Sequence, residues 1–337
     1  MKAVGYRMSL PISDPNALLD VELPKPAPTG RDLLVRVAAV SVNPVDTKVR
    51  RRAAPPPGEV RVLGWDAAGT VEATGSGCTL FKPGDAVFYA GALERQGTDA
   101  EYHLVDERLV GPKPQKLSMA EAAALPLTAV TAWETLFDRL DVRRPVPGAP
   151  RAILIIGGAG GVGSIAIQLA KALTDLTVIA TASRPETREW VRALGADHVI
   201  DHARPLAAEV AALGLGAPGV VFSTTGTDRH FDEIVELIAP QGRFGLIDDP
   251  EPIDVRKLKR KSVSLHWELM FTRSTFATAD MIEQHRLLAE VARLVDAGTL
   301  RTTLAANFGP CTAENLRRAH ALLESGRSKG KIVLEGF

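Results

Sequence analysis

A short glycine-rich loop, Gly157 to Gly163, limits more than any other feature what this chain can fold into. The apolar run Ala152–Ile156 before it is typical of a buried strand, and the pattern Val162–Leu173 after it is typical of a helix. Three of the loop's glycines have the spacing G-x-G-x-x-G, which lets the backbone turn tightly and approach a pyrophosphate. The first amides of the helix add hydrogen-bond donors and the positive end of its dipole. We therefore expect a dinucleotide to bind at Gly158, Gly160, Gly161 and Val162.

Strand-like and helical segments alternate after this loop, which indicates a parallel sheet covered on both faces. The predicted strands are Ala152–Ile156, Thr177–Thr181, Val199–Ile200, Gly219–Phe222, Arg243–Ile247 and Ser262–His266. The predicted helices between them are Val162–Leu173, Pro185–Leu194, Leu206–Leu213 and His230–Ile238. The fold class is thus α/β with a doubly wound parallel sheet, and the loop opens its first crossover. The alternative is a glycine-rich turn that only lets the helix pack closely.

The first third of the chain has a different texture, with short strands separated by Pro- and Gly-rich turns. Its predicted strands are Leu33–Ser41, Ala68–Ala73, Ala86–Tyr89 and Tyr102–Val105. Such spacing is typical of a compact β-rich unit. A Ser-x-x-Glu capping box at Ser118 then opens an Ala-rich helix that Pro126 interrupts, and a second helical pattern covers Leu127–Leu140.

The last segments break the alternation of strands and helices, so we expect them to pack on the N-terminal unit. A long helix is predicted over Ala279–Asp296, followed by an extended stretch at Thr302–Phe308. A further helix over Thr312–Glu324 and a final strand at Lys331–Leu334 complete the chain. The domains expected are a β-rich unit at 1–125, completed by 274–337, and a dinucleotide-binding unit at 126–273.

Charge and cysteine content exclude several classes of protein. The 40 Lys and Arg residues balance the 40 Asp and Glu residues, so the net charge offers no reason to expect nucleic acid or a membrane surface as a partner. Cys78 and Cys311 are too few for a disulfide framework or a four-thiolate zinc site. Neither a signal peptide nor a membrane-spanning stretch is visible, and we expect a soluble, cytoplasmic protein.

The end of the second predicted strand of the sheet indicates which dinucleotide binds. Sites for NAD place an acidic residue about 20 residues past the loop, to accept from the ribose 2′-hydroxyl. Here that stretch carries Ser183 and Arg184, with Arg188 one turn further, and no acidic residue ends the strand. A guanidinium suits a 2′-phosphate because it donates two parallel hydrogen bonds. The sequence therefore favours NADP(H), although Ser183 is also expected to cap the next helix in a capping box with Glu186.

Several further motifs extend over the whole chain. They include Ser41-Val-Asn-Pro-Val-Asp-Thr-Lys48, Gly64-Trp-Asp-Ala-Ala-Gly69, Leu125-Pro-Leu-Thr-Ala-Val-Thr-Ala-Trp-Glu134 and Gly330-Lys-Ile-Val-Leu334. With the glycine loop, these segments make the chain resemble the medium-chain dehydrogenase/reductase superfamily, its quinone oxidoreductase branch, and within it the bacterial zinc-type alcohol dehydrogenase-like proteins. The resemblance implies a GroES-like catalytic domain, a Rossmann NADP(H)-binding domain and a homodimer.

The residues that bind zinc in true zinc alcohol dehydrogenases are missing at the matching positions. Those enzymes carry a catalytic Cys near the position of Asn43 and a His-Glu pair at the position of Trp65-Asp66, and a four-Cys structural site would fall near 91–99. Catalytic zinc needs about three protein ligands. We therefore expect no metal site, and hydrogen bonds from the protein must stabilise the charge that develops during hydride transfer.

The resemblance also assigns roles to single residues. It places Asn43 and Asp46 beside the nicotinamide and substrate, and Thr128 and Thr131 at the nicotinamide end; we take Asn43, Asp46 and Thr131 as catalytic. Alternatives are an Asn43-Pro44 turn, a cap of a short helix at Asp46 and a packing role for Thr131. Expected cofactor contacts at the sheet edge are His202, Ser223, Thr224, Ile247 and Asp248, and the alternative for His202 is a place in a surface loop. Trp267 and Phe271 are expected to form an apolar substrate wall, or alternatively a dimer interface.

Together these patterns predict an NADPH-dependent, zinc-independent oxidoreductase that transfers hydride to a small-molecule quinone or conjugated carbonyl. One alternative is an enoyl or alkenal double-bond reductase, which often uses a tyrosine to protonate carbon. The tyrosines are Tyr6, Tyr89 and Tyr102. Another alternative is an NADPH-binding sensor that has no catalytic activity.

Overall fold

The computed structural model describes residues 1–337 and contains two compact units. The first unit combines Met1–Val130 with Phe271–Phe337, and the second is Thr131–Met270. The sequence predicted the divisions at 125/126 and 273/274. In the structure, the first division falls between Val130 and Thr131. This position lies within helix α3 (Pro126–Trp133), so residues of this one helix belong to both units.

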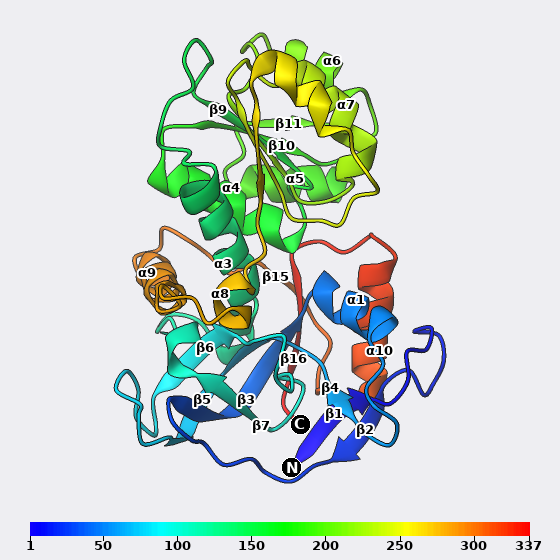
Figure 1. Cartoon of the computed structure of the whole chain (residues 1–337), viewed down its shortest axis with the longest axis vertical. Helices are drawn as coiled ribbons and strands as arrows, with labels where there is room; N and C mark the ends of the chain where they lie inside the picture. Colours follow the sequence, from blue (N-terminus) through cyan, green and yellow to red (C-terminus); the bar gives the residue numbers. More distant parts are fainter. The chain divides into compact units, whose positions relative to one another are not determined.

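The second unit is built on a six-stranded sheet in the order β11-β10-β9-β12-β13-β14, and every neighbouring pair is parallel (Figure 1). Its strands are β9 (Ala152–Ile156), β10 (Thr177–Thr181), β11 (His198–Ile200), β12 (Val220–Ser223), β13 (Arg243–Leu246) and β14 (Ser264–Trp267). All five residues of β9 are buried, as expected for a central strand covered on both faces. The predicted doubly wound parallel sheet is confirmed.

Helices of the second unit follow the strands in alternation. They are α4 (Gly161–Leu173), α5 (Pro185–Ala193), α6 (Leu206–Ala211) and α7 (Thr227–Leu237), with the π-helix η2 (Glu134–Arg139) and the 3-10 helix η3 (Val255–Lys261). The predicted starts of one helix and one strand are wrong, each for an identifiable reason. Helix α7 begins three residues before the predicted His230, because the Asp248 carboxylate accepts the Thr227 N–H at 2.9 Å. Strand β14 begins at Ser264 because Ser262 is left-handed (φ 51°) and ends η3.

The first unit contains two sheets. The larger has the order β15-β16-β3-β5-β6-β8, with β7 also paired to β3. Its strands are β3 (Asp32–Val42), β5 (Asp66–Thr74), β6 (Ala86–Ala90), β7 (Tyr102–Asp106), β8 (Val110–Pro112), β15 (Leu304–Asn307) and β16 (Lys331–Glu335). Because β16 pairs antiparallel with β3, the predicted return of the C-terminal segment to the N-terminal unit is confirmed. The smaller sheet, β2 (Leu19–Glu22), β1 (Lys2–Tyr6) and β4 (Arg61–Val62), was not predicted.

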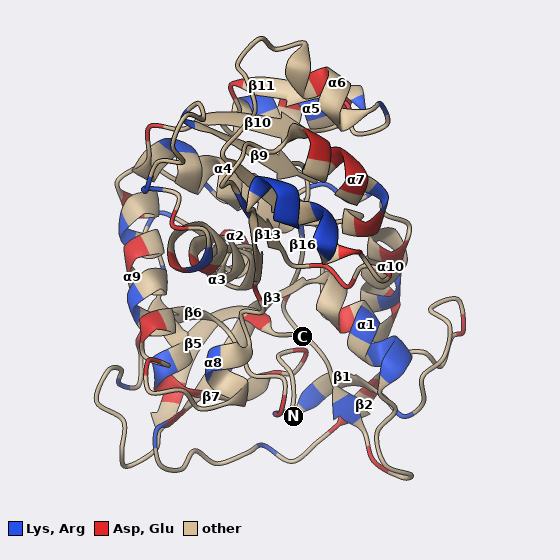
Figure 2. Cartoon of the chain, turned by 45° about the horizontal axis from the view of Figure 1, so that its top comes forward, with Lys and Arg blue, Asp and Glu red and all other residues tan.

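Helices of the first unit lie around these sheets. They are α1 (Pro44–Arg52), α2 (Met119–Ala123), α3, α8 (Thr272–Thr275), α9 (Glu283–Asp296) and α10 (Ala313–Glu324), with the 3-10 helix η1 (Glu107–Leu109). The capping box predicted at Ser118 is present, because its hydroxyl accepts the Glu121 N–H at 3.2 Å. Basic and acidic residues alternate along α9 (Figure 2). None of the helices is both long and apolar enough to cross a bilayer.

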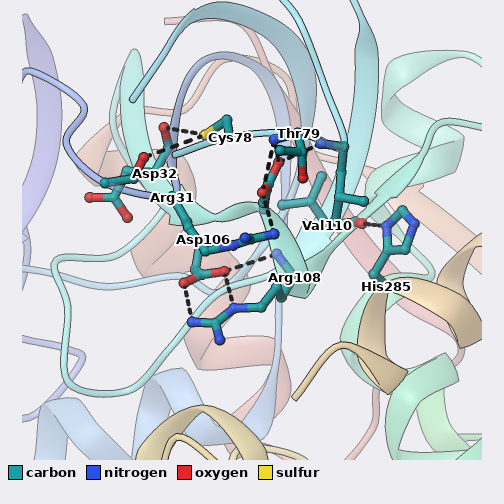
Figure 3. Close-up of polar contacts among 11 residues, drawn as sticks. Arg31, Asp32, Cys78, Thr79, Asp106, Arg108, Val110 and His285 are labelled. Carbon is teal, nitrogen blue, oxygen red and sulfur yellow. Dashed lines mark hydrogen bonds and ion pairs between the residues drawn. The ribbon is translucent and has the colours of Figure 1, made fainter. Parts of the chain in front are cut away.

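A fully buried carboxylate, that of Glu107, ties together the three segments of the first unit that carry Arg31, Thr79 and Arg108, which are labelled in Figure 3. It accepts the N–H groups of Thr79 and Leu80 at 2.9 and 2.7 Å, and it pairs with the Arg31 guanidinium at 2.6 Å. These contacts join η1, the turn after β5 and the residue before β3. In the same turn the Cys78 thiol donates to the Asp32 carbonyl at 3.3 Å.

Replacing Glu107 should therefore destabilise the first unit. Glu107→Ala leaves two backbone donors without their acceptor, and we expect the free energy of unfolding to fall by about 1–3 kcal/mol. Urea unfolding followed by tryptophan fluorescence measures the change. Glu72→Ala is the matched control, because Glu72 pairs with Lys25 where solvent screens the two charges, so its loss should destabilise the protein far less than the loss of Glu107. Equal losses for the two variants would contradict the anchoring role of Glu107.

Candidate active site and cofactor-binding site

The glycine loop is closely packed at Gly157, Gly158 and Gly163, where an added β-carbon would clash with a neighbouring atom. Gly157 has a positive φ of 79°. A β-carbon on Gly163 would lie 2.4 Å from the Gly157 carbonyl oxygen, and one on Gly158 would lie 2.9 Å from the Ala180 β-carbon. Helix α4 begins at Gly161 with Gly160 as its N-cap, and no side chain caps it. Its first amides are therefore available for an acceptor outside the helix, such as a pyrophosphate.

The carboxyl ends of β12 and β13 are joined by a chain of hydrogen bonds. The buried Ser223 hydroxyl lies 2.8 Å from the Thr227 hydroxyl, which donates to the Asp248 carboxylate at 2.6 Å. Thr227 was not singled out from the sequence, although a Thr directly after Gly226 at a helix start was a usable signal. Beside this chain, Thr224 donates both its N–H and its hydroxyl to the Ile156 carbonyl, at 3.1 and 2.9 Å. Ile247 follows β13 directly and is half-buried.

At the end of β10, the structure corrects the predicted N-cap of the next helix and shows the contacts of Arg188. The N-cap of α5 is Arg184, not Ser183, and the Thr187 hydroxyl accepts the Arg184 N–H at 3.2 Å. Ser183 therefore lies outside the helix and takes no part in its cap. The Arg188 guanidinium donates to the carbonyls of Ala182 and Val199, at 3.1 and 3.0 Å. It thus bridges the ends of β10 and β11, and two of its donors are used within the protein.

In the first unit, Asn43 belongs to a buried ionic network that the sequence did not predict. The Lys331 ammonium lies 3.0 Å from Asp66 Oδ2 and donates to Asn43 Oδ1 and, at 2.7 Å, to the Val42 carbonyl. Asn43 Nδ2 donates to the same Asp66 oxygen at 2.8 Å. All three side chains are at most 3% exposed. The strand order of the sheet accounts for these contacts. Strands β16, β3 and β5 are neighbours, and their pairing brings Lys331, Asn43 and Asp66 to the same end of the sheet.

The second oxygen of Asp66 extends this network to helix α3. Asp66 Oδ1 accepts the Leu127 N–H at 2.7 Å, in the first turn of α3. An anion is favoured there, because the helix dipole is positive at its N-terminus. Helix α3 also carries Thr128 and Thr131, which are both buried. The Thr128 hydroxyl donates to the Leu125 carbonyl at 3.0 Å.

Asp46 is fully buried at the start of α1, three residues after the N-cap Asn43. Its Oδ2 atom accepts the Asn43 N–H, while its Oδ1 atom is buried without a hydrogen-bond partner. Burial raises the pKa of Asp46 from 3.8 to about 7, although the bond from Asn43 and the charge of Lys331 oppose this rise. Asp46 therefore carries a proton for a large fraction of the time near neutral pH.

The two residues expected to form an apolar substrate wall differ in their surroundings. Phe271 belongs to the first unit, is buried, and packs edge-on against Trp65 with 5.9 Å between ring centroids. Trp267 ends β14, the edge strand of the sheet in the second unit, and is 55% exposed.

Comparisons with known proteins agree with this architecture. Residues 29–124 match the alcohol dehydrogenase GroES-like domain family, and residues 194–334 match the zinc-binding dehydrogenase family. A zinc-type alcohol dehydrogenase-like protein of Staphylococcus aureus is 42% identical, over 99% of both chains. The chain belongs to the medium-chain dehydrogenase/reductase superfamily. The family resemblance predicted from the sequence is confirmed, and the protein is an oxidoreductase of this superfamily.

Other relatives in the superfamily cover nearly the whole chain. The crystal structure of a candidate zinc-dependent alcohol dehydrogenase protein from Rhizobium etli is 67% identical with a TM-score of 0.98, covering 100% of this chain and 98% of that one. A chloroplastic quinone-oxidoreductase homolog of spinach is 29% identical over 95% of this chain and 94% of its own. A mycobacterial protein solved with NADPH is 28% identical with a TM-score of 0.83, covering 99% and 100%.

Although several superfamily relatives are named for zinc, the residues at the expected ligand positions do not fit that ion. The structure contains no group of three or more His, Cys, Asp or Glu side chains able to hold a metal. At the positions of the missing ligands, Asn43 and Asp66 are engaged by the Lys331 ammonium. A metal ion there would have to displace or neutralise that ammonium, because two cations repel each other strongly in a buried site.

Breaking this buried pair should cost more than removing it whole. Lys331→Met leaves the Asp66 charge uncompensated, and we expect a loss of about 3–5 kcal/mol in the free energy of unfolding. In the double variant Lys331→Met/Asp66→Asn the unpaired charge is gone, so the loss should be smaller than that of Lys331→Met alone, and hence smaller than the sum of the two single losses. Urea unfolding of the four proteins gives the coupling energy. Additive losses would show that the two charges do not interact.

Proposed function

We propose that this superfamily member is an NADPH-dependent, zinc-independent oxidoreductase that reduces quinones or similar conjugated carbonyls. The observation that carries the proposal is the Lys331–Asp66–Asn43 network. Asn43 and Asp66 match positions where zinc dehydrogenases carry metal ligands, and here both contact the Lys331 ammonium. Without a Lewis acid, the preferred substrate is one that accepts hydride readily. The relative from spinach, a quinone-oxidoreductase homolog, supports this substrate class.

The cofactor assignment rests on the sheet edge of the second unit. The α4 amides would hold the pyrophosphate, and Ser183 and Arg184 would meet the ribose of the adenosine half. No acidic side chain follows β10 until Glu186, whose carboxylate pairs with Arg184 at 3.2 Å. The mycobacterial relative solved with NADPH supports the same choice. When bound, the cofactor supplies the hydride.

We assign the matching proton to Asp46. Reduction of a quinone to a hydroquinone adds one hydride and one proton in total, and a buried carboxyl with a pKa of about 7 holds such a proton at neutral pH. Its unpartnered Oδ1 atom is the position from which the proton leaves. Lys331, Asp66 and the Asn43 amide act on Asp46 by holding the first turn of α1, because Asn43 is both the N-cap and the donor to Asp46.

The alternative of a double-bond reductase with a tyrosine acid finds less support. The Tyr6 hydroxyl donates to the Ala53 carbonyl, and Tyr89 is buried with its hydroxyl 3.0 Å from His103 Nδ1. Burial raises the pKa of both phenols, which makes them weaker acids. Tyr102 lies beneath the Lys25 ammonium at 3.8 Å. We therefore favour quinones over simple enoyl substrates.

The proposed activity should appear in steady-state assays with NADPH and a panel of quinones, enones and primary alcohols. We expect turnover of quinones that is unchanged by a metal chelator, with little or no alcohol oxidation. Fluorescence titration establishes separately whether NADPH binds. Tight NADPH binding without turnover of any quinone or enone would contradict the proposal and favour the non-catalytic sensor.

The role of Asp46 predicts a pH dependence. Because the protonated carboxyl is the active form, kcat/KM should fall as the pH rises through about 7, and Asp46→Asn should remove this limb and lower the rate by about 10²–10⁴-fold. Asp85→Asn is the matched control. Asp85 also accepts the N–H three residues before it, but in an exposed turn at Lys82. If Asp46→Asn keeps the pH limb, Asp46 is not the acid.

A further inference from the structure

Two histidines and two arginines from three elements form a cationic cluster in the second unit. Arg184 follows β10, His202 follows β11, and Arg229 and His230 lie in the first turn of α7 after β12. The rings of His202 and His230 are 6.4 Å apart and nearly perpendicular. A β-carbon on Gly226 would lie 2.7 Å from an Arg229 guanidinium nitrogen, so this guanidinium folds back toward the end of β12.

The strand register brings this cluster to the position of Ser183. Thr181 of β10 pairs with Ile200 of the parallel strand β11. Ser183 and His202 each lie two residues beyond these partners. The Ala182 N–H donates to the Ile200 carbonyl at 3.0 Å, so the two chains still run together beyond the strands. His202 therefore lies at the same sheet edge as the residues proposed for the adenosine ribose.

In the protein alone, the surroundings of the two imidazoles disfavour their protonated form. Burial lowers the pKa of His202 and of His230, and the charge of Arg229 lowers both further. Arg184 also lowers the pKa of His202, and His202 lowers the pKa of His230. The opposing charges are Asp201 beside His202, and Asp228 and Glu233 beside His230. Moreover, His202 Nδ1 is buried and has no hydrogen-bond partner.

We propose that Arg229, His202 and His230 recognise the 2′-phosphate of NADP(H), and that the imidazoles take up protons when this phosphate binds. This inference rests on the proposed function, to which it adds two residues of α7 and a link to pH. A phosphate monoester carries about −1.5 to −2 charges at pH 7, enough to reverse the repulsion within the cluster. NADH lacks this group and should bind without the protons.

The linkage is measurable by isothermal titration calorimetry of the full-length protein. Titrations with NADPH and NADH in buffers of different ionisation enthalpy give the number of protons taken up. We expect about one more proton with NADPH than with NADH near pH 7.5. The ratio of Kd for NADH to Kd for NADPH should then rise by up to about tenfold for each pH unit lowered from about 8 to about 6.5. Above its own second pKa of about 6, the phosphate contributes little to this slope.

Three variants separate the roles within the cluster. His202→Asn/His230→Asn should abolish the extra proton uptake and flatten the pH dependence, while NADH affinity stays within about twofold. Arg229→Gln should weaken NADPH binding at every pH, but it should keep the proton uptake. His198→Asn is the matched control, because His198 begins β11 at the opposite end of that strand, and it should leave all values unchanged.

The outcomes distinguish this inference from the proposed function. If NADPH binds more tightly than NADH without extra proton uptake, the cofactor assignment stands and the histidine linkage is wrong. If NADPH has no advantage over NADH at any pH, both are wrong. An unchanged proton count in the double histidine variant would assign the protons to other groups and likewise overturn the inference.

Discussion

The buried contact between Lys331 and Asp66 is the interaction on which the rest of the first unit depends. It joins the last strand of the chain to β5, and through Asn43 it reaches the end of β3 and the start of α1. The other oxygen of Asp66 accepts a hydrogen bond from the first turn of α3. A charge in such a dry position is stable only with its partner in place. Lys331 and Asp66, which are 265 positions apart in the sequence, are therefore required together at one end of one sheet.

The same contact links the architecture to the proposed chemistry. Asn43 is the N-cap of α1 and the donor to Asp46, so the network that holds Asn43 also determines the surroundings of the proposed acid. An ammonium group in the network provides a fixed positive charge without a metal. The second unit provides the proposed phosphate site, which is the closely packed turn between β9 and α4. No side chain caps α4, so its first amides are available to a phosphate.

Prediction from the sequence succeeded where the signal is local. The strand before the glycine loop, the helix after it and the Ser118 capping box follow from neighbouring residues, and all three are present. It failed where a distant residue decides. Asp248 accepts the Thr227 N–H from 21 residues away, and α7 therefore starts earlier than the local pattern predicts. One error was local, because Thr187 rather than Glu186 completes the cap at Arg184. The strands β1 and β2 were missed because both are short, with five and four residues, and β1 does not alternate between polar and apolar residues.

The sequence alone determined the α/β class, the glycine loop, the family resemblance and the absence of cysteine ligands, because each is a property of residue type and short spacing. Only the tertiary structure decided which polar groups meet. It revealed Lys331 beside Asp66, assigned Arg188 to two backbone carbonyls, and gathered His202 with His230 and Arg229. These contacts between distant side chains depend on strand order and strand register. Order and register follow from the packing of the whole chain, and no short segment of the sequence encodes them.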